Sequence, residues 1–424
     1  MSKNPLDRLL EVGTQGAGVN ASRGRKHKHP AGWTPGVEIG RDSGTVVTEP
    51  RATAPEDWDD LLAELLPAGF NVDDYEVEGG TVEVRAWDAN VGGGDTERLY
   101  YFKARIRRRA TVEADLQLED IISAAKSSKT PKVREYDFEE RCYWLQITDL
   151  QAGQADGDGV EGMVARVQEL ADLASADLKS LKAQGKPATQ ILVPITGDLV
   201  EGVSGWYDMQ TFSVALDRRD QVKLVRRLLA EFLIQISEHG LPVHVAVVPG
   251  NHGEYRQNGK AFTTLGDNDD VAVVEQIAEA FSLAGNKQHV TFSFPSRERL
   301  SLTIEVLGWV VGLTHGHIAR GGGTGVEGKI LGWFKSMAAT RDPIGDSDLL
   351  FTGHYHHGRY QQLVGDTYWV QGGALCDSSA WFSQSAGLVS DPVVMKGTIT
   401  RNQVVESVMP YVWPRTKPES RNVA

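Results

Sequence analysis

The chain is short of cysteine, of long apolar runs and of positive charge, and each shortage argues against a class of protein. Its 424 residues include only two cysteines, so we expect neither a disulfide framework nor a thiolate metal site, which suits a reducing compartment. No segment approaches about 18 consecutive apolar residues, and the amino-terminal sequence has no signal-like apolar run, so we expect a cytoplasmic protein without membrane association. The net charge of −13 argues against a general nucleic-acid-coating surface, so any contact with a polyanion must be local.

Composition and periodicity divide the chain into five segments. Residues 1–35 are rich in Gly, Ser and basic residues and predict a flexible basic tail. A helix-like run followed by alternating strand-like runs predicts a small α+β accessory domain over 36–115. Residues 116–140 are polar and predict a linker. The main domain is expected over 141–412, and a C-terminal tail over 413–424.

The main domain has a repeating pattern in which an apolar strand-like run ends in a polar loop and a helical stretch follows. The predicted helices cover 160–184, 216–238 and 271–284. Continuous apolar runs are typical of strands that are buried on both faces. The pattern predicts an α/β fold, and in such folds ligands bind just beyond the carboxyl ends of the parallel strands.

Five of the apolar runs end in loops that carry metal-capable side chains. These are Asp149 with Gln151, Asp198 with Glu201, Asn251 with His252, His315 with His317, and His354 with His356. Each has an ordinary explanation when taken alone, because an aspartate often caps a helix and a lone histidine is more often structural than a ligand. Five such ends in succession are harder to explain in that way.

The donor types in these loops suit a pair of divalent ions. Mn²⁺, Fe²⁺ and Zn²⁺ accept mixed carboxylate, amide and imidazole ligands, and one aspartate can bridge two ions about 3.5–4 Å apart. If the GHYH segment is extended, His354 and His356 point to the same side and Tyr355 points away.

The series DLQ (149–151), GDLVE (197–201), GNHGE (250–254), THGH (314–317) and GHYH (353–356) resembles the five-motif signature of the calcineurin-like metallophosphoesterases. The resemblance spans about 145–375, and its layout is most similar to the double-strand-break repair exonucleases. It implies an αββα sandwich with mixed sheets and a catalytic role for the main domain. It also implies two divalent metal ions, for which we expect Mn²⁺, with Mg²⁺, Fe²⁺ or Zn²⁺ as alternatives.

The resemblance also implies a role for each matched residue. The first ion would be held by Asp149, Gln151, Asp198 and His356, and the second by Asp198, Asn251, His315 and His354. Asp198 is then the bridging and catalytically essential ligand, and His252 is a catalytic group beside the phosphate. We choose His315 over His317 because the family ligand is directly followed by glycine. The candidate substrate contacts are Arg256, His317, Arg320 and Arg359, and for Arg320 and Arg359 a structural role is an open alternative.

Two positions depart from the family pattern. Gln151 stands where the family usually has histidine, which predicts a weaker first site that favours Mn²⁺ or Mg²⁺ over Zn²⁺. The acid that usually follows GNH is displaced by one position, with Gly253 before Glu254. Glu254 is a candidate catalytic residue that orients His252, but Asp149 or another carboxylate could do so.

The function expected from these residues is metal-dependent hydrolysis of phosphodiesters in nucleic acid or nucleotides, by attack of a metal-bound hydroxide and in an exonuclease-like manner. One alternative is a phosphomonoesterase or cyclic-nucleotide phosphodiesterase, which the acidic overall charge favours. Another is a non-catalytic binding protein on the same scaffold, which the departures at Gln151 and Glu254 favour. The expected partner is a nucleic-acid or nucleotide substrate, and a homo-oligomer is an open alternative.

Overall fold

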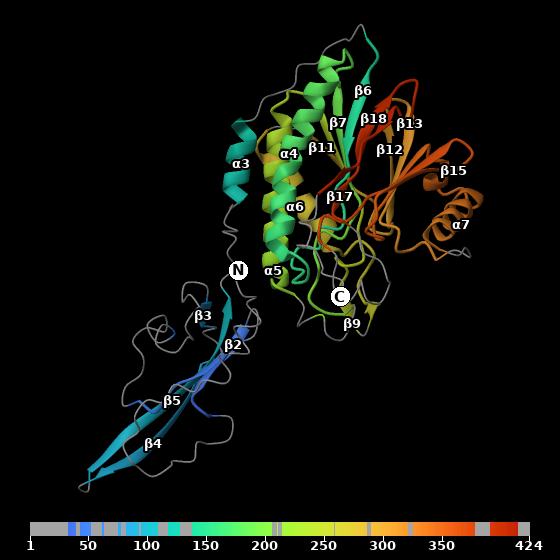
Figure 1. The fold of residues 1–424 in the computed structure, drawn as a ribbon. Coiled ribbons are helices and arrows are strands. Elements are labelled where there is room, and N and C mark those ends of the chain that lie inside the picture. Colours follow the sequence, from blue (N-terminus) through green and yellow to red (C-terminus); the bar gives the residue numbers. More distant parts are fainter. Residues whose placement is uncertain are drawn as a thin grey trace, which may run out of the picture. The chain divides into compact units, whose positions relative to one another are not determined.

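The computed structural model describes residues 33–39, 43–51, 62, 75–77, 82–92, 95–108, 118–127, 138–205, 210, 214–257, 259–285, 290–320, 325–377 and 391–413. The chain divides into two compact units, Met1–Thr111 and Val112–Ala424. Figure 1 shows the elements of both units.

The first unit contains an antiparallel five-stranded sheet. Its strands are β1 (Gly36–Ile39), β2 (Ser43–Val47), β3 (Tyr75–Val77), β4 (Glu83–Gly92) and β5 (Asp95–Arg108). The long strand β5 pairs with β2, β3 and β4. Trp33, which we had assigned to the tail, is buried against Val47 and Tyr101, because a large aromatic side chain here completes a small apolar cluster. The rest of the predicted tail lies outside the described residues, as does the predicted helix of this unit except for Leu62.

The second unit is built on two mixed sheets. The first has the order β11 (Val290–Ser293), β8 (Val243–Val247), β7 (Gln190–Ile195), β6 (Arg141–Leu145), β18 (Lys396–Thr400), β19 (Ser407–Val408). The second has the order β12 (Ser301–Val306), β13 (Trp309–Thr314), β14 (Leu349–Thr352), β16 (Thr367–Gln371), β15 (Arg359–Val364). Strands β11, β8, β7 and β6 are parallel, as are β13, β14 and β16, and the remaining pairs in these sheets are antiparallel. Two short strand pairs lie outside them, β9 (Arg256–Gln257) with β10 (Lys260–Ala261) and β17 (Val393–Val394) with β20 (Tyr411–Val412).

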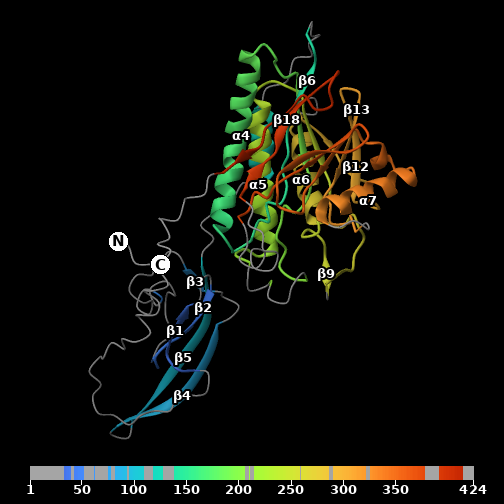
Figure 2. The same ribbon diagram turned by 45° about the vertical axis from the view of Figure 1, so that its right-hand side comes forward.

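Helices cover the outer face of each sheet, on opposite sides of the pair (Figures 1 and 2). The first sheet is covered by α3 (Leu118–Ser127), α4 (Gly159–Ala183), α5 (Arg218–Ser237) and α6 (Asp269–Leu283), and the second by α7 (Gly325–Ala339) and η4 (Pro343–Asp346). The helices predicted over 160–184, 216–238 and 271–284 are thus confirmed as α4, α5 and α6. Asp217 caps α5 and Asn268 caps α6, each accepting a bond from a backbone N–H of the first turn.

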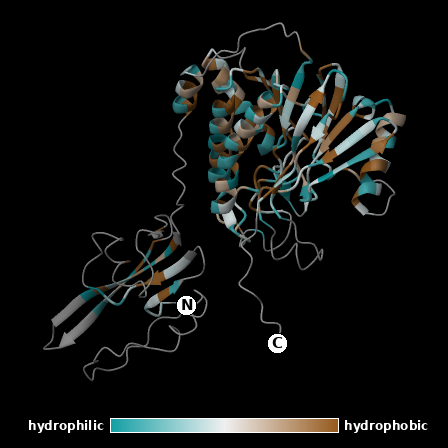
Figure 3. Cartoon of the chain, turned by 45° about the horizontal axis from the view of Figure 1, so that its top comes forward, coloured by the Kyte–Doolittle hydropathy of each residue, from teal (hydrophilic) through white to brown (hydrophobic). Residues whose placement is uncertain are grey.

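Three apolar clusters hold the four layers together. One joins the helices to the first sheet, a second lies between the sheets, and a third joins the second sheet to α7. Between the sheets, the ring centroids of Trp144 and Phe351 are 5.0 Å apart in an edge-to-face contact. Figure 3 shows apolar residues concentrated on the inner strands and polar residues on the outward helix faces. The mixed α/β class is confirmed, and the layer order is that of the predicted αββα sandwich.

Two predicted boundaries need correction. The range that we predicted as a linker, 116–140, contains α3, whose Ile121 and Ala125 are buried against the helical layer. The polar residues around these two apolar positions hid the helix, because they occupy its outward face. Trp413, assigned to the C-terminal tail, is buried and donates its indole N–H to Glu169.

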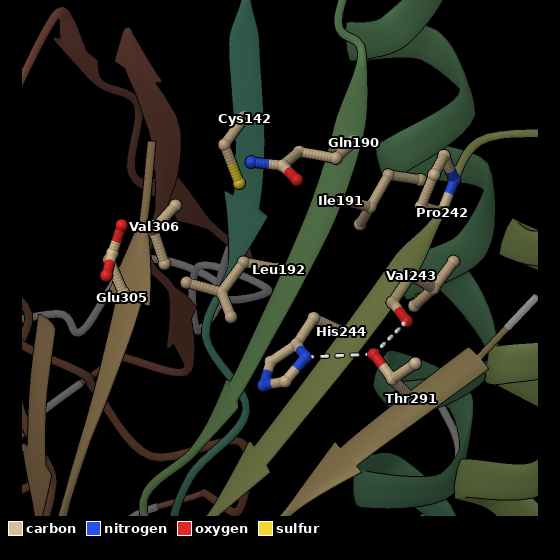
Figure 4. Close-up of a pocket in the computed structure, with 10 residues that line it drawn as sticks. All are labelled: Cys142, Gln190, Ile191, Leu192, Pro242, Val243, His244, Thr291, Glu305 and Val306. Atoms are coloured by element: carbon tan, nitrogen blue, oxygen red, sulfur yellow. Dashed lines mark hydrogen bonds between the residues drawn. The ribbon is translucent and has the colours of Figure 1, made fainter. Parts of the chain in front are cut away.

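A cavity of about 160 Å³ lies at the amino-terminal ends of β6, β7 and β8 (Figure 4). His244 lines it, and its ring nitrogens lie 2.9 Å from the Thr291 hydroxyl and 3.1 Å from the Ser293 hydroxyl. Because both nitrogens have hydroxyl partners, we assign this imidazole a structural role at the sheet edge. Among the described residues, no helix combines the length and hydrophobicity needed to cross a bilayer.

Candidate metal centre

Side chains from both sheets meet beyond the carboxyl ends of their parallel strands. Donor atoms of Asp198 (after β7), His315 (after β13) and His354 (after β14) all lie within 4.8 Å of one another. Asp149, after β6, joins them, because its Oδ1 lies 3.4 Å from His356 Nε2 and its Oδ2 accepts the backbone N–H of His354 at 3.0 Å. Asp149, Asp198 and His315 are at most 1% exposed. The structure therefore brings together most of the residues that the sequence singled out as ligands.

The backbone is strained at this place. Non-glycine residues with positive φ within the described ranges include Asp149, Gln151, Asp198, His354 and His356, with φ between 43° and 74°. The left-handed region costs a non-glycine residue on the order of 1–3 kcal/mol and is concentrated at functional sites. The surrounding fold holds these five residues in an unfavourable conformation that turns them toward one cluster.

This backbone geometry corrects one of our arguments about the GHYH segment. We had expected an extended segment in which alternate residues share a side. Residues 353–358 are irregular, and both His354 and His356 are left-handed. The two histidines still reach the cluster, but they do so through turns. Tyr355 packs against the apolar cluster that joins the second sheet to α7. The Nδ1 of His357 lies 2.7 Å from the Tyr355 carbonyl oxygen.

Two buried atoms indicate that the cluster suits a cation. Asn251 Oδ1 and His315 Nε2 are buried, and neither atom has a hydrogen-bond partner within the described part of the chain. The Nδ1 of His315 donates to the Thr196 carbonyl oxygen at 2.6 Å, which directs Nε2 toward Asp198 Oδ2, 2.9 Å away. A carbonyl partner that fixes the tautomer in this way is typical of metal-binding histidines. Because an unsatisfied buried acceptor is costly, these donor atoms fit a divalent ion.

The charges in the cluster lead to the same conclusion. Burial would raise the pKa of the Asp198 carboxyl, but the imidazoles of His315 and His252 lower it overall. Burial would lower the pKa of His315, but the Asp198 carboxylate raises it to about 9. The buried carboxylates are thus stabilised by nearby positive charge. Protons on the imidazoles and a divalent ion would compete to provide that charge.

Gln151 has a partner that the sequence did not indicate. Its Oε1 accepts a hydrogen bond from the buried thiol of Cys376 at 3.1 Å, and its Nε2 lies 3.4 Å from His252 Nε2. The backbone N–H groups of Leu375 and Cys376 also bond to the Asp149 carbonyl oxygen. The amide therefore lies beside the cluster, with the 375–376 segment supporting it.

His252 is held by Glu201, whereas Glu254 has other partners. The Nδ1 of His252 lies 2.9 Å from the Glu201 carbonyl oxygen and 3.3 Å from its Oε2. Burial would lower the pKa of this imidazole, but the charges of Glu201 and Asp198 raise it to about 10. Glu254 pairs with Arg256 at 2.7 Å and lies 3.6 Å from His317 Nε2. The sequence left open whether Glu254, Asp149 or another carboxylate orients His252, and the carboxylate that contacts its ring is Glu201, the last residue of GDLVE.

The candidate substrate contacts have mixed surroundings. Arg256 also donates to the Gly259 carbonyl oxygen, and the guanidinium of Arg359 lies 5.2 Å from the centroid of the Trp369 ring. Both are thus engaged with the protein. Arg320 is exposed and directly precedes residues 321–324, which lie outside the described residues. His317 lies closest to the cluster, with its ring centroid 5.4 Å from that of His315, and burial together with His315 lowers its pKa to about 2.

Asp270 was missed by the sequence analysis. It lies in the first turn of α6, is fully buried, and accepts backbone hydrogen bonds from the loops that carry Asp198 and Asn251. Its sequence context, an acidic first turn of a helix, is so common that nothing in it distinguishes this aspartate.

Comparison with known proteins does not assign a family or a function to this chain. No protein-family model and no curated protein matches the chain. Solved structures that it resembles include a single mutant of Vps29 from Entamoeba histolytica, with 14% identity, a TM-score of 0.28 and coverage of 64% of this chain and 99% of that one. Another is the phosphopantetheinyl hydrolase of Mycobacterium tuberculosis, with 12% identity, a TM-score of 0.27 and coverage of 56% and 92%. A third is a 5'-nucleotidase from Candida albicans, with 12% identity, a TM-score of 0.27 and coverage of 65% and 53%. TM-scores this low establish no relationship.

Proposed function

We propose that this chain is a metal-dependent phosphoesterase and, within that class, a phosphodiesterase that acts on nucleic acid or nucleotides in an exonuclease-like manner. The observation that supports this most is the meeting of donor atoms from both sheets at Asp198, His315 and His354. The resemblance of the five motifs to the calcineurin-like metallophosphoesterases supplies the reaction class.

The residues of the cluster would hold two divalent ions. Asp198 would be a ligand in both halves of the site, together with His315, His354 and Asn251 in one half and Asp149, His356 and Gln151 in the other. When bound, such ions neutralise the charge of phosphate oxygens and lower the pKa of a coordinated water. The neutral amide of Gln151 in place of an imidazole favours Mn²⁺ or Mg²⁺ over Zn²⁺ in its half of the site.

His252 is the proton donor in this proposal. Its backbone N–H donates to Asp198 Oδ1 at 2.7 Å, which holds residue 252 beside the cluster, and the Glu201 carbonyl oxygen holds the ring at Nδ1. An imidazolium held there can stabilise the phosphate and pass a proton to the leaving oxygen. A covalent intermediate is not required, and burial raises the pKa of the nearby Cys376 thiol well above its usual value, which makes it a poor nucleophile.

One observation favours a second function, a binding protein on the same scaffold. The Gln151 oxygen that would face an ion accepts the Cys376 thiol instead. An amide that kept this bond would leave the first site short of a ligand, and a protein that lost that ion could bind an anion at the second site with little or no hydrolysis.

A substrate panel with purified protein and Mn²⁺ tests the proposal. The panel compares single-stranded DNA, duplex DNA, RNA, a generic phosphodiester and a generic phosphomonoester. We expect hydrolysis of diesters, with release of mononucleotides from strand ends, and loss of turnover in Asp198→Asn. Preference for the monoester would support the phosphatase alternative. Mn²⁺ binding with no hydrolysis of any substrate would support the binding protein, and full turnover by Asp198→Asn would refute the bridging role.

A further inference from the structure

A single buried carboxylate connects two of the loops that form the candidate metal centre. Asp270 Oδ2 accepts the backbone N–H groups of Asp198 and Gly250, both at 2.9 Å. Its Oδ1 accepts the backbone N–H of Leu199 at 2.9 Å. Asp270 belongs to α6, a third element, and its side chain is fully buried. One side chain therefore fixes the backbone of both loops.

The two loops need such a partner because their backbones approach closely in an unusual conformation. Asp198 is left-handed at φ 53° and lies beyond β7, which ends at Ile195, so the N–H groups of Asp198 and Leu199 need partners outside that strand's ladder. A Cβ on Gly250 would lie 2.2 Å from the Asp198 nitrogen, which shows how tightly the loops pack. Converging buried N–H groups form a binding place for an anion, and the Asp270 carboxylate occupies it.

The position of Asp270 and Asn268 also explains Gly253, the second glycine in GNHGE. A Cβ on Gly253 would lie 2.5 Å from Asn268 Oδ1 and 3.0 Å from Asp270 Cγ. Asn268 is itself held in place, because it accepts the N–H of Asp270 at 2.9 Å and donates to the Gly250 carbonyl oxygen at 2.8 Å. Side chains from the start of α6 thus fill the space next to position 253.

We propose that Asp270 is a positioning residue for the metal centre. It supplies from α6 the buried anion that orders the loops presenting Asp198 and Asn251, and position 253 is glycine because Asn268 and Asp270 occupy the space of any side chain there. The effect of Asp270 on turnover rests on the proposed function, whereas the ordering of the loops does not.

The neighbouring residue Asp269 provides a matched control. It lies in the same first turn and carries the same charge, but it pairs with Arg218 at 2.5 Å and accepts the Tyr255 hydroxyl at 3.2 Å. A general effect of negative charge on the helix would be the same for both aspartates. Only Asp270 contacts the backbone of both loops, whereas Asp269 reaches only the Gly253 carbonyl, through Arg218 and its own backbone N–H.

The test is amide hydrogen exchange, followed by mass spectrometry, on the metal-free full-length chain. We expect Asp270→Asn to raise exchange about tenfold or more in peptides covering 196–202 and 248–253, with no change in α4, and to weaken Mn²⁺ binding about 10–100-fold in titration calorimetry. Asp269→Asn should leave exchange in 196–202 unchanged, because Asp269 reaches only the other loop, through Arg218 and the Gly253 carbonyl. Equal effects of the two substitutions, or unchanged loops in Asp270→Asn, would overturn the proposal.

A second variant keeps the test decisive if Asp270→Asn does not fold. Gly253→Ala retains the carboxylate but places a methyl group against Asn268 and Asp270, so we expect the same local rise in exchange in the two loops. Normal exchange there would refute the explanation of Gly253. Because the exchange measurements need neither metal nor substrate, their failure is distinct from a failure of the proposed enzymatic function.

Discussion

At the scale of single residues, the candidate centre combines unfavourable backbone conformations with unsatisfied side-chain atoms. Asp198 is left-handed and buried, and Asn251 Oδ1 is buried without a hydrogen bond inside the described part of the chain. Neither feature stabilises the fold. Their coincidence at one place is what a ligand-binding role explains.

The pairing of His252 with Glu201 leads to a prediction about catalysis. We expect His252→Ala to lower kcat on a diester by about 10²–10⁴-fold while Mn²⁺ content stays the same, because the imidazole acts on the leaving oxygen and is not a ligand. Glu201→Gln should lower kcat less, because the Glu201 carbonyl still holds the ring. Steady-state kinetics and metal analysis on the same samples measure both effects.

The double variant separates a positioning role of Glu201 from an independent one. If Glu201 acts through His252, then His252→Ala combined with Glu201→Gln should be no slower than His252→Ala alone. A further drop in the double variant would show that Glu201 has its own part in the reaction. Loss of Mn²⁺ in His252→Ala would show that His252 is a ligand.

At the scale of elements, the sequence was informative where a pattern repeats and silent where a contact is unique. The apolar runs predicted the parallel strands and α4, α5 and α6, because burial on both faces and a 3.6-residue period leave a clear mark. The short helix α3 has few apolar positions among polar ones and was taken for a linker.

The candidate site shows the same contrast. The residues at the strand ends could be found because parallel strands bring their carboxyl ends to one edge. The roles of Glu201 and Asp270 could not be settled, because each depends on how a side chain from one loop or helix meets the backbone of another. The reason for Gly253 became visible only once α6 was placed against the loop.

Glu406 gives a prediction at this scale, because it ties the edge of the first sheet to β6. Its carboxylate accepts bonds from Arg141 at 2.5 and 2.7 Å and from the Thr398 hydroxyl at 2.9 Å. The Arg141 guanidinium, assisted by Thr398 and Lys186, lowers the pKa of the carboxyl to about 2 despite partial burial. An unfolded glutamate has a pKa of about 4.3, so the folded state gains stability above that pH and loses it as the pH falls toward 2.

We therefore expect Glu406→Gln to lower the free energy of unfolding by about 2 kcal/mol at pH 7, and the difference from the wild type to shrink as the pH falls from about 5 to 2. Urea unfolding at a series of pH values measures this. Glu140→Gln is the control, since its pair with Arg401 is far more exposed and should be worth less than about 1 kcal/mol at any pH. A pH-independent loss in Glu406→Gln would contradict the assignment.

At the scale of the whole molecule, the chain divides at Thr111 and Val112, and the candidate centre draws all of its residues from the second unit. That unit has its own apolar clusters in and between its layers. It should therefore fold and bind metal without the first unit.

We expect residues 112–424 to bind Mn²⁺ with the affinity of the full chain, and a shorter version starting at 138 to be less stable by at least about 2 kcal/mol. The reason is that the shorter version lacks α3, whose Ile121 and Ala125 cover apolar surface of the helical layer, where α3 contacts α5 and α6. Urea unfolding and titration calorimetry on the two truncated chains and the full chain measure both quantities.

Ile121→Ala in the full chain should reproduce part of the loss of stability. Equal stability of the two truncated chains would show that α3 is the linker that the sequence suggested, and loss of Mn²⁺ binding in 112–424 would show that the first unit contributes to the centre.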